Sequence, residues 1–190
     1  EQMTRSATMF PATNSLLRYA TILTVGVLAM LNLAVTSGCK LGANRHNAIG
    51  CQAYNQGQIN TAIAEFNKAI EMNPNDADAI YNLGASYYAI GKQTKNLQAT
   101  QSAEQLYRRT ISIDDQHQEA HRSLAVLLIE NGQEQYGFDL INSWKNRYPT
   151  ATEPVVELAK LYQEYGDNSR AADLLVDALK INPNDVQVLS

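Results

Sequence analysis

Residues 73–76 read Asn-Pro-Asn-Asp, and residues 182–185 repeat the same four residues. Pro74 and Pro183 are 109 residues apart, and Pro149 lies 34 residues before Pro183. Three periods of 34 residues and one insertion of seven residues account for the whole interval. A fixed period of about 20–50 residues indicates a repeat architecture, in which each unit packs on its neighbours. The recurrence predicts the units 43–76, 77–117, 118–151 and 152–185, with the start of a further helix at 186–190.

Two segments carry the residue pattern of these units. Residues 79–88 read AIYNLGASYY, with Leu83-Gly84 ahead of a tyrosine, and residues 62–70 read AIAEFNKAI. Both segments, together with the 34-residue period, resemble the tetratricopeptide repeat (TPR) family. The resemblance covers residues 43–185. It implies an all-α fold: a right-handed α-solenoid of four helix-turn-helix units, with a concave groove lined by the first helix of each unit.

The residue types at fixed positions have simple physical reasons. Small residues such as Gly50 and Gly84 are expected where two helices touch closely. Glycines are expected just beyond the C-terminus of each first helix, at Gly57, Gly91, Gly132 and Gly166. The seven extra residues fall within 92–102, and their spacing predicts a longer second helix in the second unit rather than a loop. Trp144 occupies a normally small position, so it must change local packing or lie partly exposed.

The N-terminal region differs from the repeats in composition. Residues 1–42 carry a net charge of +2 and residues 43–190 carry −6. No charged residue occurs in 19–39, and arginines precede this apolar stretch. This pattern predicts that residues 1–38 form a hydrophobic signal peptide or membrane-anchor helix, with residues 39–42 as a short linker.

Ser37 and Gly38 directly before Cys39 resemble the lipobox of bacterial lipoproteins, although Thr36 stands where that family prefers an aliphatic residue. The resemblance implies lipidation of Cys39 and a lipoprotein of the bacterial cell envelope that faces the periplasm or the exterior. Ordinary signal cleavage and a single-pass membrane protein are the alternatives. A disulfide between Cys39 and Cys51 is possible only without lipidation.

The composition disfavours several function classes. The 190 residues include 15 Lys and Arg against 19 Asp and Glu, a net charge of −4, so a general nucleic-acid-binding surface is not expected. His117 and His121 are spaced i, i+4, but the glutamate of a zinc-protease motif is one place late and a third ligand is missing, so we expect no metal. Cys51 has no histidine on its helix face and is expected to be a half-buried free thiol. With no catalytic motif, the sequence predicts no enzyme and no cofactor.

The first helices supply the expected binding surface. The residues predicted to face the groove are Asn47, Cys51, Tyr54, Asn55, Asp78, Tyr81, Tyr88, Arg122, Ile129, Lys160 and Gln163. Tyr54, Tyr81 and Tyr88 form a predicted aromatic patch, and Asp78, Glu119, Glu130, Glu153 and Glu164 outnumber the cations there, so a neutral or basic peptide is favoured over an anionic tail. The basic carboxylate clamp of chaperone-tail binders is absent.

These patterns lead to two hypotheses. The first is an exported, lipid-anchored and non-catalytic TPR scaffold that docks a protein or peptide ligand, is held to the membrane through its N-terminus, and helps to organise a cell-envelope assembly. It resembles small repeat lipoproteins that assist pilus or outer-membrane assembly. The alternative is an accessory TPR domain of a longer enzyme or a truncated polypeptide.

Overall fold

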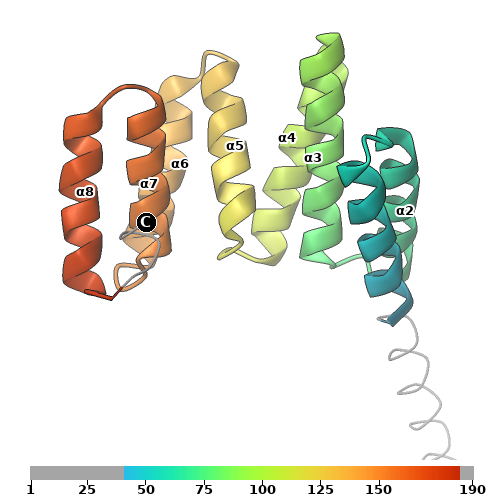
Figure 1. The fold of residues 1–190 in the computed structure, drawn as a ribbon, viewed down its shortest axis with the longest axis horizontal. Coiled ribbons are helices and arrows are strands. Elements are labelled where there is room, and N and C mark those ends of the chain that lie inside the picture. The colour runs from blue at the N-terminus through green and yellow to red at the C-terminus, as the bar shows by residue number, and fades with distance from the viewer. Residues whose placement is uncertain (1–40, 185–190) are drawn as a thin grey trace, which may run out of the picture. The chain divides into compact units, whose positions relative to one another are not determined.

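The computed structural model describes residues 41–184, and within that range every regular element is helical (Figure 1). Residues 41–55 form a helix, and the helices that follow are α2 (Ile59–Met72), α3 (Ala77–Thr94), α4 (Leu97–Ile113), α5 (Gln118–Glu130), α6 (Glu134–Arg147), α7 (Glu153–Glu164) and α8 (Asn168–Ile181). The predicted signal or anchor segment 1–38, Cys39 and the further helix at 186–190 lie outside the described residues. None of the helices in 41–184 is long and apolar enough to cross a bilayer.

The helices of residues 43–184 pair as four successive hairpins, as the period predicts. Helix 41–55 packs on α2, α3 on α4, α5 on α6, and α7 on α8, while each hairpin also contacts the next. We call 41–55, α3, α5 and α7 the first helices, and α2, α4, α6 and α8 the second helices. Buried side chains from neighbouring hairpins meet in shared core clusters, for example Phe66 with Leu83 and Ile141 with Leu158. The prediction of an all-helical TPR-like solenoid is therefore confirmed for this region.

The small residues lie where helices approach closely. A Cβ at Gly50 would lie 2.5 Å from Phe66 Cε1, and a Cβ at Gly84 would lie 2.9 Å from Tyr107 Cε1. These large rings are almost fully buried. Any larger residue at either glycine would force the two helices of its hairpin apart, because the interior has no spare volume.

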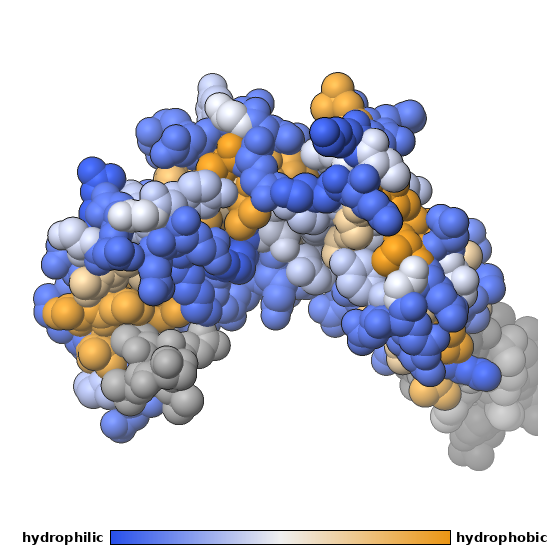
Figure 2. Space-filling view, turned by 45° about the horizontal axis from the view of Figure 1, so that its top comes forward, coloured by the Kyte–Doolittle hydropathy of each residue, from blue (hydrophilic) through white to orange (hydrophobic). Residues whose placement is uncertain are grey.

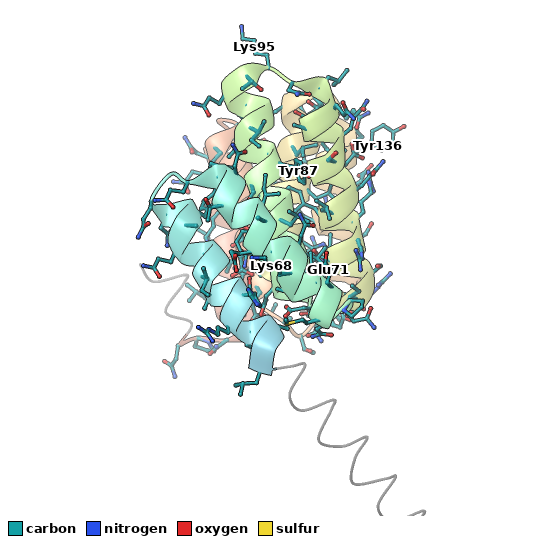
Figure 3. The ribbon with its side chains drawn as sticks, turned by 90° about the vertical axis from the view of Figure 1, so that its right-hand side faces the viewer. Lys68, Glu71, Tyr87, Lys95 and Tyr136 are labelled. Atoms are coloured by element: carbon teal, nitrogen blue, oxygen red, sulfur yellow. The ribbon has the colours of Figure 1, made fainter. Side chains whose placement is uncertain are left out.

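Three of the four predicted turn glycines are confirmed. Gly57, Gly132 and Gly166 adopt positive φ angles of 75°, 79° and 88°, a conformation that costs other residues energy. Gly91 does not end a helix: it is buried inside α3, which continues to Thr94. The left-handed residue of this hairpin is Lys95, with φ of 54°, and Figure 3 shows its side chain at the tip of the hairpin.

The insertion lengthens both helices of the second unit rather than the second helix alone. Helix α3 has 18 residues, against 13 in α5 and 12 in α7. Helix α4 has 17 residues, against 14 in each of α2, α6 and α8. The Asn96 side chain accepts a hydrogen bond from the Ala99 N–H at 3.1 Å and so caps the start of α4. The prediction of helix over loop is correct, but its placement entirely in the second helix is wrong.

Trp144 changes local packing rather than remaining exposed. Its side chain is buried and its ring stacks on His121, with a centroid distance of 4.4 Å and an interplanar angle of 2°.

The last helix of the solenoid, α8, exposes apolar side chains: Val176 and Ile181 are 53% and 38% exposed. Figure 2 shows apolar surface at the end that carries α8.

Candidate functional site

A cavity of about 300 Å³ opens between the first helices of the first two units. Its lining comprises Cys51, Tyr54, Asn55, Phe66, Tyr81, Asn82 and Ala85. Four of these residues, Cys51, Tyr54, Asn55 and Tyr81, were predicted from the sequence to face the groove. We call this space the groove cavity.

The floor of the groove cavity is a polar cluster. The Asn82 side-chain amide donates to Asn47 Oδ1 at 2.9 Å and approaches Cys51 Sγ at 3.4 Å. Burial raises the pKa of the Cys51 thiol, which favours the protonated form over the nucleophilic thiolate. His46 is hydrogen-bonded to Glu65 at 2.6 Å, so it is engaged away from the thiol. The geometry favours a structural Cys51 beside an amide that can hydrogen-bond a ligand.

The three tyrosines predicted as one patch are divided between two places. Tyr81 lies beside Tyr54 in the groove cavity; its ring centroid is 5.0 Å from that of His117, and its hydroxyl contacts Ser123 Oγ at 3.3 Å. Tyr88 instead donates a hydrogen bond to Glu130 at 2.5 Å and lines a separate cavity of about 380 Å³ near the tip of the second hairpin. Tyr88 lies two helical turns beyond Tyr81 on α3, so the predicted tyrosines line two cavities instead of one.

The two predicted cations of the face are engaged by a carboxylate that was not predicted. Glu157 on α7 is 2% exposed and accepts hydrogen bonds from Arg122 at 2.9 Å, Lys160 at 2.9 Å and Gln118 at 2.8 Å. Arg122 also pairs with Glu164. Burial alone would raise the pKa of Glu157, but the bonds from Lys160, Gln118 and Arg122 hold it below its ordinary value. Arg122 and Gln118 on α5 therefore tie the third unit to the fourth, whereas Lys160 pairs with Glu157 within α7.

The remaining predicted residues have different positions. Asp78 and Glu119 are exposed and lie 3.4 Å and 3.3 Å from the His117 ring, and in the described part of the chain neither pairs with a lysine or arginine. Gln163 is exposed on α7. The prediction that Ile129 faces the groove is wrong. Its side chain is only 8% exposed and belongs to the core beside Phe138, because Gly137 leaves space for it.

The two histidines have structural roles. His117 Nδ1 accepts a hydrogen bond from the Ala120 N–H at 3.2 Å and caps α5. His121 is buried, contacts the Asp115 carbonyl through Nε2 at 3.1 Å and stacks on Trp144. Among residues 41–184, no three His, Cys, Asp or Glu side chains gather in a way that could hold a metal ion.

Comparison with known proteins identifies the fold. A family model described as TPR repeat matches residues 52–91. The solved structures of MamA and of PilF from Pseudomonas aeruginosa superpose with TM-scores of 0.53 and 0.57, each at 18% sequence identity. The MamA alignment covers 74% of this chain and 78% of that one, and the PilF alignment covers 80% and 66%. The fold is that of a TPR solenoid.

A curated relative is the DnaJ homolog subfamily C member 7 homolog of Schizosaccharomyces pombe, which is 24% identical over 158 residues. The match covers 77% of this chain but 33% of the relative. The chain thus spans about one third of the length of this curated relative. At these identities the similarities establish the fold of the chain, and they do not identify what its surfaces bind.

Proposed function

We propose that this TPR solenoid is a non-catalytic scaffold that binds a neutral or basic peptide segment across its first helices, beginning at the groove cavity. The observation that carries the proposal is the convergence of Tyr54, Asn55, Tyr81 and Asn82 on one cavity. Tyrosine offers a large contact area at low entropic cost, and the asparagine amides can hydrogen-bond an extended peptide backbone.

The charges near this cavity favour a basic peptide over an acidic one. Asp78 and Glu119 are exposed and lack lysine or arginine partners within residues 41–184. Arg122 and Lys160 are held by buried Glu157, so neither is free to bind a carboxylate tail. An acidic peptide would therefore meet repulsion without a compensating clamp.

The proposal is tested by selecting ligands for the full chain from a displayed library of random peptides and measuring their affinities by calorimetry. Tyr54→Ala and Asn55→Ala are each expected to weaken the selected peptides about five- to tenfold. Tyr136→Ala is the matched control, because Tyr136 is 69% exposed and points away from the helices (Figure 3). Equal affinities in all variants would contradict docking at the groove cavity.

We further propose that the chain is exported, lipid-anchored through Cys39 and part of a cell-envelope assembly. Support comes from the apolar, cationic N-terminal pattern and the small residues before Cys39. The intact mass of the membrane-extracted protein is expected to correspond to a chain that begins at Cys39 and carries acyl groups, and Cys39→Ser should abolish both features. A chain that begins at Cys39 without lipid would indicate ordinary secretion, and an uncleaved chain would indicate a single-pass anchor.

A second candidate function is an accessory TPR module within a longer polypeptide. It is favoured by the match to a relative of which this chain covers 33%. Sequencing the transcript beyond the codon for Ser190 separates the two: an immediate stop codon would contradict the module, and a continuing reading frame would support it.

A further inference from the structure

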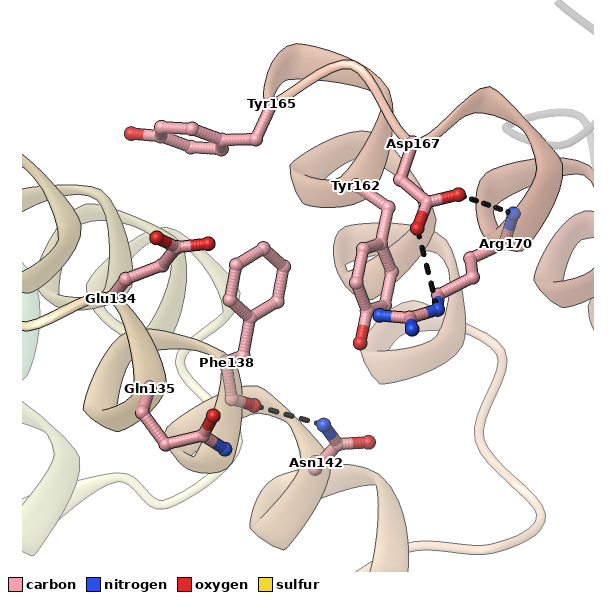
Figure 4. A pocket seen from close by; sticks show the side chains of 8 residues that line it. All are labelled: Glu134, Gln135, Phe138, Asn142, Tyr162, Tyr165, Asp167 and Arg170. Carbon is pink, nitrogen blue, oxygen red and sulfur yellow. Dashed lines mark hydrogen bonds and ion pairs between the residues drawn. The ribbon is translucent and has the colours of Figure 1, made fainter.

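A larger cavity, of about 610 Å³, lies between α6, the end of α7 and the start of α8. It is lined by Glu134, Gln135, Phe138, Asn142, Tyr162, Tyr165, Asp167 and Arg170 (Figure 4). We call it the side cavity. It shares no residue with the groove cavity, and its volume is within the range of about 300–1,000 Å³ that is usual for ligand sites.

Three aromatic rings form one wall of the side cavity. Phe138 stacks on Tyr162 with a centroid distance of 4.6 Å, and Tyr165 stands edge-on to Phe138 at 6.2 Å and 73°. Phe138 is largely buried, whereas Tyr165 is 44% exposed. The fixed Phe138 ring and the accessible Tyr165 ring therefore present two aromatic surfaces at a steep angle to each other.

This wall already holds one cation. The Arg170 guanidinium carbon lies 5.4 Å from the centroid of Tyr162, and Arg170 Nε pairs with Asp167 at 3.3 Å. The charges of Arg170 and Asp167 cancel each other, and Arg170 covers the ring of Tyr162. The exposed ring of Tyr165 remains for a second cation, because a ring face attracts positive charge through its quadrupole.

A carboxylate completes the arrangement. Figure 4 shows the Glu134 side chain beside the space between the rings of Phe138 and Tyr165. Glu134 is exposed in the first turn of α6 and forms no ion pair with any described residue. Burial raises the pKa of Tyr165, and the negative charges of Glu130, Glu164 and Glu134 raise it further, while the charge of Lys92 lowers it; acidic groups outnumber basic ones around this ring.

We propose that the side cavity binds the guanidinium group of an arginine presented by a partner protein. Arginine fits better than lysine, because its planar group can stack on Tyr165 while its N–H groups bind the Glu134 carboxylate in a bidentate manner. The cavity is large enough for the residues that flank the arginine. This site does not depend on the groove cavity, so it is a second point of attachment, formed by the third and fourth units instead of the first two.

The test measures equilibrium binding of three capped pentapeptides to the immobilised full chain by surface plasmon resonance. The peptides are identical except for a central arginine, lysine or citrulline, the last being a neutral analogue of arginine. The arginine peptide is expected to bind about fivefold or more tightly than the citrulline peptide. Tyr165→Ala is expected to weaken it about three- to tenfold, and Glu134→Gln about two- to fivefold.

Matched variants locate the site. Tyr136→Ala, on the same helix as Phe138, and Glu71→Gln, an exposed carboxylate of α2, should leave the affinity unchanged. Equal binding of the citrulline peptide, or no loss in Tyr165→Ala, would overturn the proposal. If Tyr54→Ala weakened the arginine peptide while Tyr165→Ala did not, the arginine would bind in the groove cavity, and the side-cavity proposal would fail while the proposed function stood.

Discussion

Glu157→Gln is expected to lower the free energy of unfolding by about 1.5 kcal/mol. The carboxylate accepts from Gln118 and Lys160 at Oε1 and from Arg122 at Oε2, and the site is 2% exposed. A glutamine has one acceptor oxygen, so at least one of these positions becomes an N–H group that faces a donor. One charge-assisted bond contributes about 1.5–3 kcal/mol, and we take the low end because the Arg122 side chain is 30% exposed and keeps Glu164 as a partner.

Urea denaturation followed by both circular dichroism and Trp144 fluorescence measures this loss. Trp144 is the only tryptophan of the sequence, and it is buried in the third unit, so it reports on the region that Glu157 ties to the fourth unit. The control is Glu153→Gln, an exposed carboxylate at the start of the same helix, which should change stability by less than about 0.5 kcal/mol. If Glu157→Gln were as stable as the control, the buried ion pairs could not be a tie between units.

The pH dependence gives an independent check of the same residue. In the folded chain the pKa of Glu157 lies below its ordinary value of 4.5, so the ionised group stabilises the fold fully above that pH. This stabilisation is lost as the pH falls through the folded pKa. The stability difference between the wild-type chain and Glu157→Gln is therefore expected to be constant from about pH 7 to pH 5 and to shrink below about pH 4.5. A difference that grew on acidification would refute the sign of this argument.

Four further substitutions or measurements test other parts of the structure. Gly137→Ala is expected to lower the free energy of unfolding by about 1–3 kcal/mol in urea, because the new Cβ would lie 2.5 Å from Ile129 Cγ1; a stabilised variant would show that the helices can separate without cost. Lys95→Gly is expected to raise it by about 0.5 kcal/mol, because Lys95 has a φ of 54°; a lower thermal midpoint would contradict that conformation. In a Cys39→Ser background, Cys51 should react with Ellman's reagent more slowly in the folded chain than in urea, since burial raises its pKa; equal rates would mean that the thiol is freely exposed. Burial lowers the pKa of His121 below its ordinary value of 6.5, so stability should decline as the pH falls from about 6.5 towards the folded pKa, and His121→Phe should flatten that decline; an unchanged slope would assign it to another group.

The repeat positions set by local sterics could be predicted from the sequence. Gly50 and Gly84 each lie against a ring that leaves no room for a side chain, and Gly57 has a backbone conformation that favours glycine. Such requirements depend on one hairpin at a time, so a 34-residue period transfers them directly. This is why the hairpins and most of the turns agree with the prediction.

The insertion and the environment of Ile129 depend on less local information. The second hairpin turns at Lys95 and Asn96, and the only local signal for that site is an asparagine suited to cap α4. The helical phase of Ile129 predicts a position in the groove, but its side chain packs into the core because Gly137 has no side chain to fill that space. Whether a residue near a helix end is buried depends on the neighbouring helix as well as on its own.

A separation that recurs in contacts between units also shows how Glu157 could have been found. Two hydrogen bonds between successive first helices join residues one period plus one apart: Asn47 to Asn82 and Arg122 to Glu157 are both separated by 35 residues. Across the seven-residue insertion the separation becomes 42, as in Tyr81 to Ser123. A search of the sequence for complementary polar residues at these separations would have found Glu157 and shown that Arg122 is engaged.

The same two separations show which polar groups of the first helices lack a matching partner at that place in the next unit. The residue 35 places after Tyr54 is Ala89, and the residue 42 places after Asp78 is Ala120. The residue 35 places after Glu119 is Pro154. None of these partners has a side chain that can donate or accept a hydrogen bond, so the polar groups of Tyr54, Asp78 and Glu119 have no partner at the corresponding place in the next unit. Because binding energy is available only from groups that the fold does not already use, the acidic and aromatic specificity of this face should reside in the first two units and at the start of α5, while Arg122, bound to Glu157, ties the last two units together.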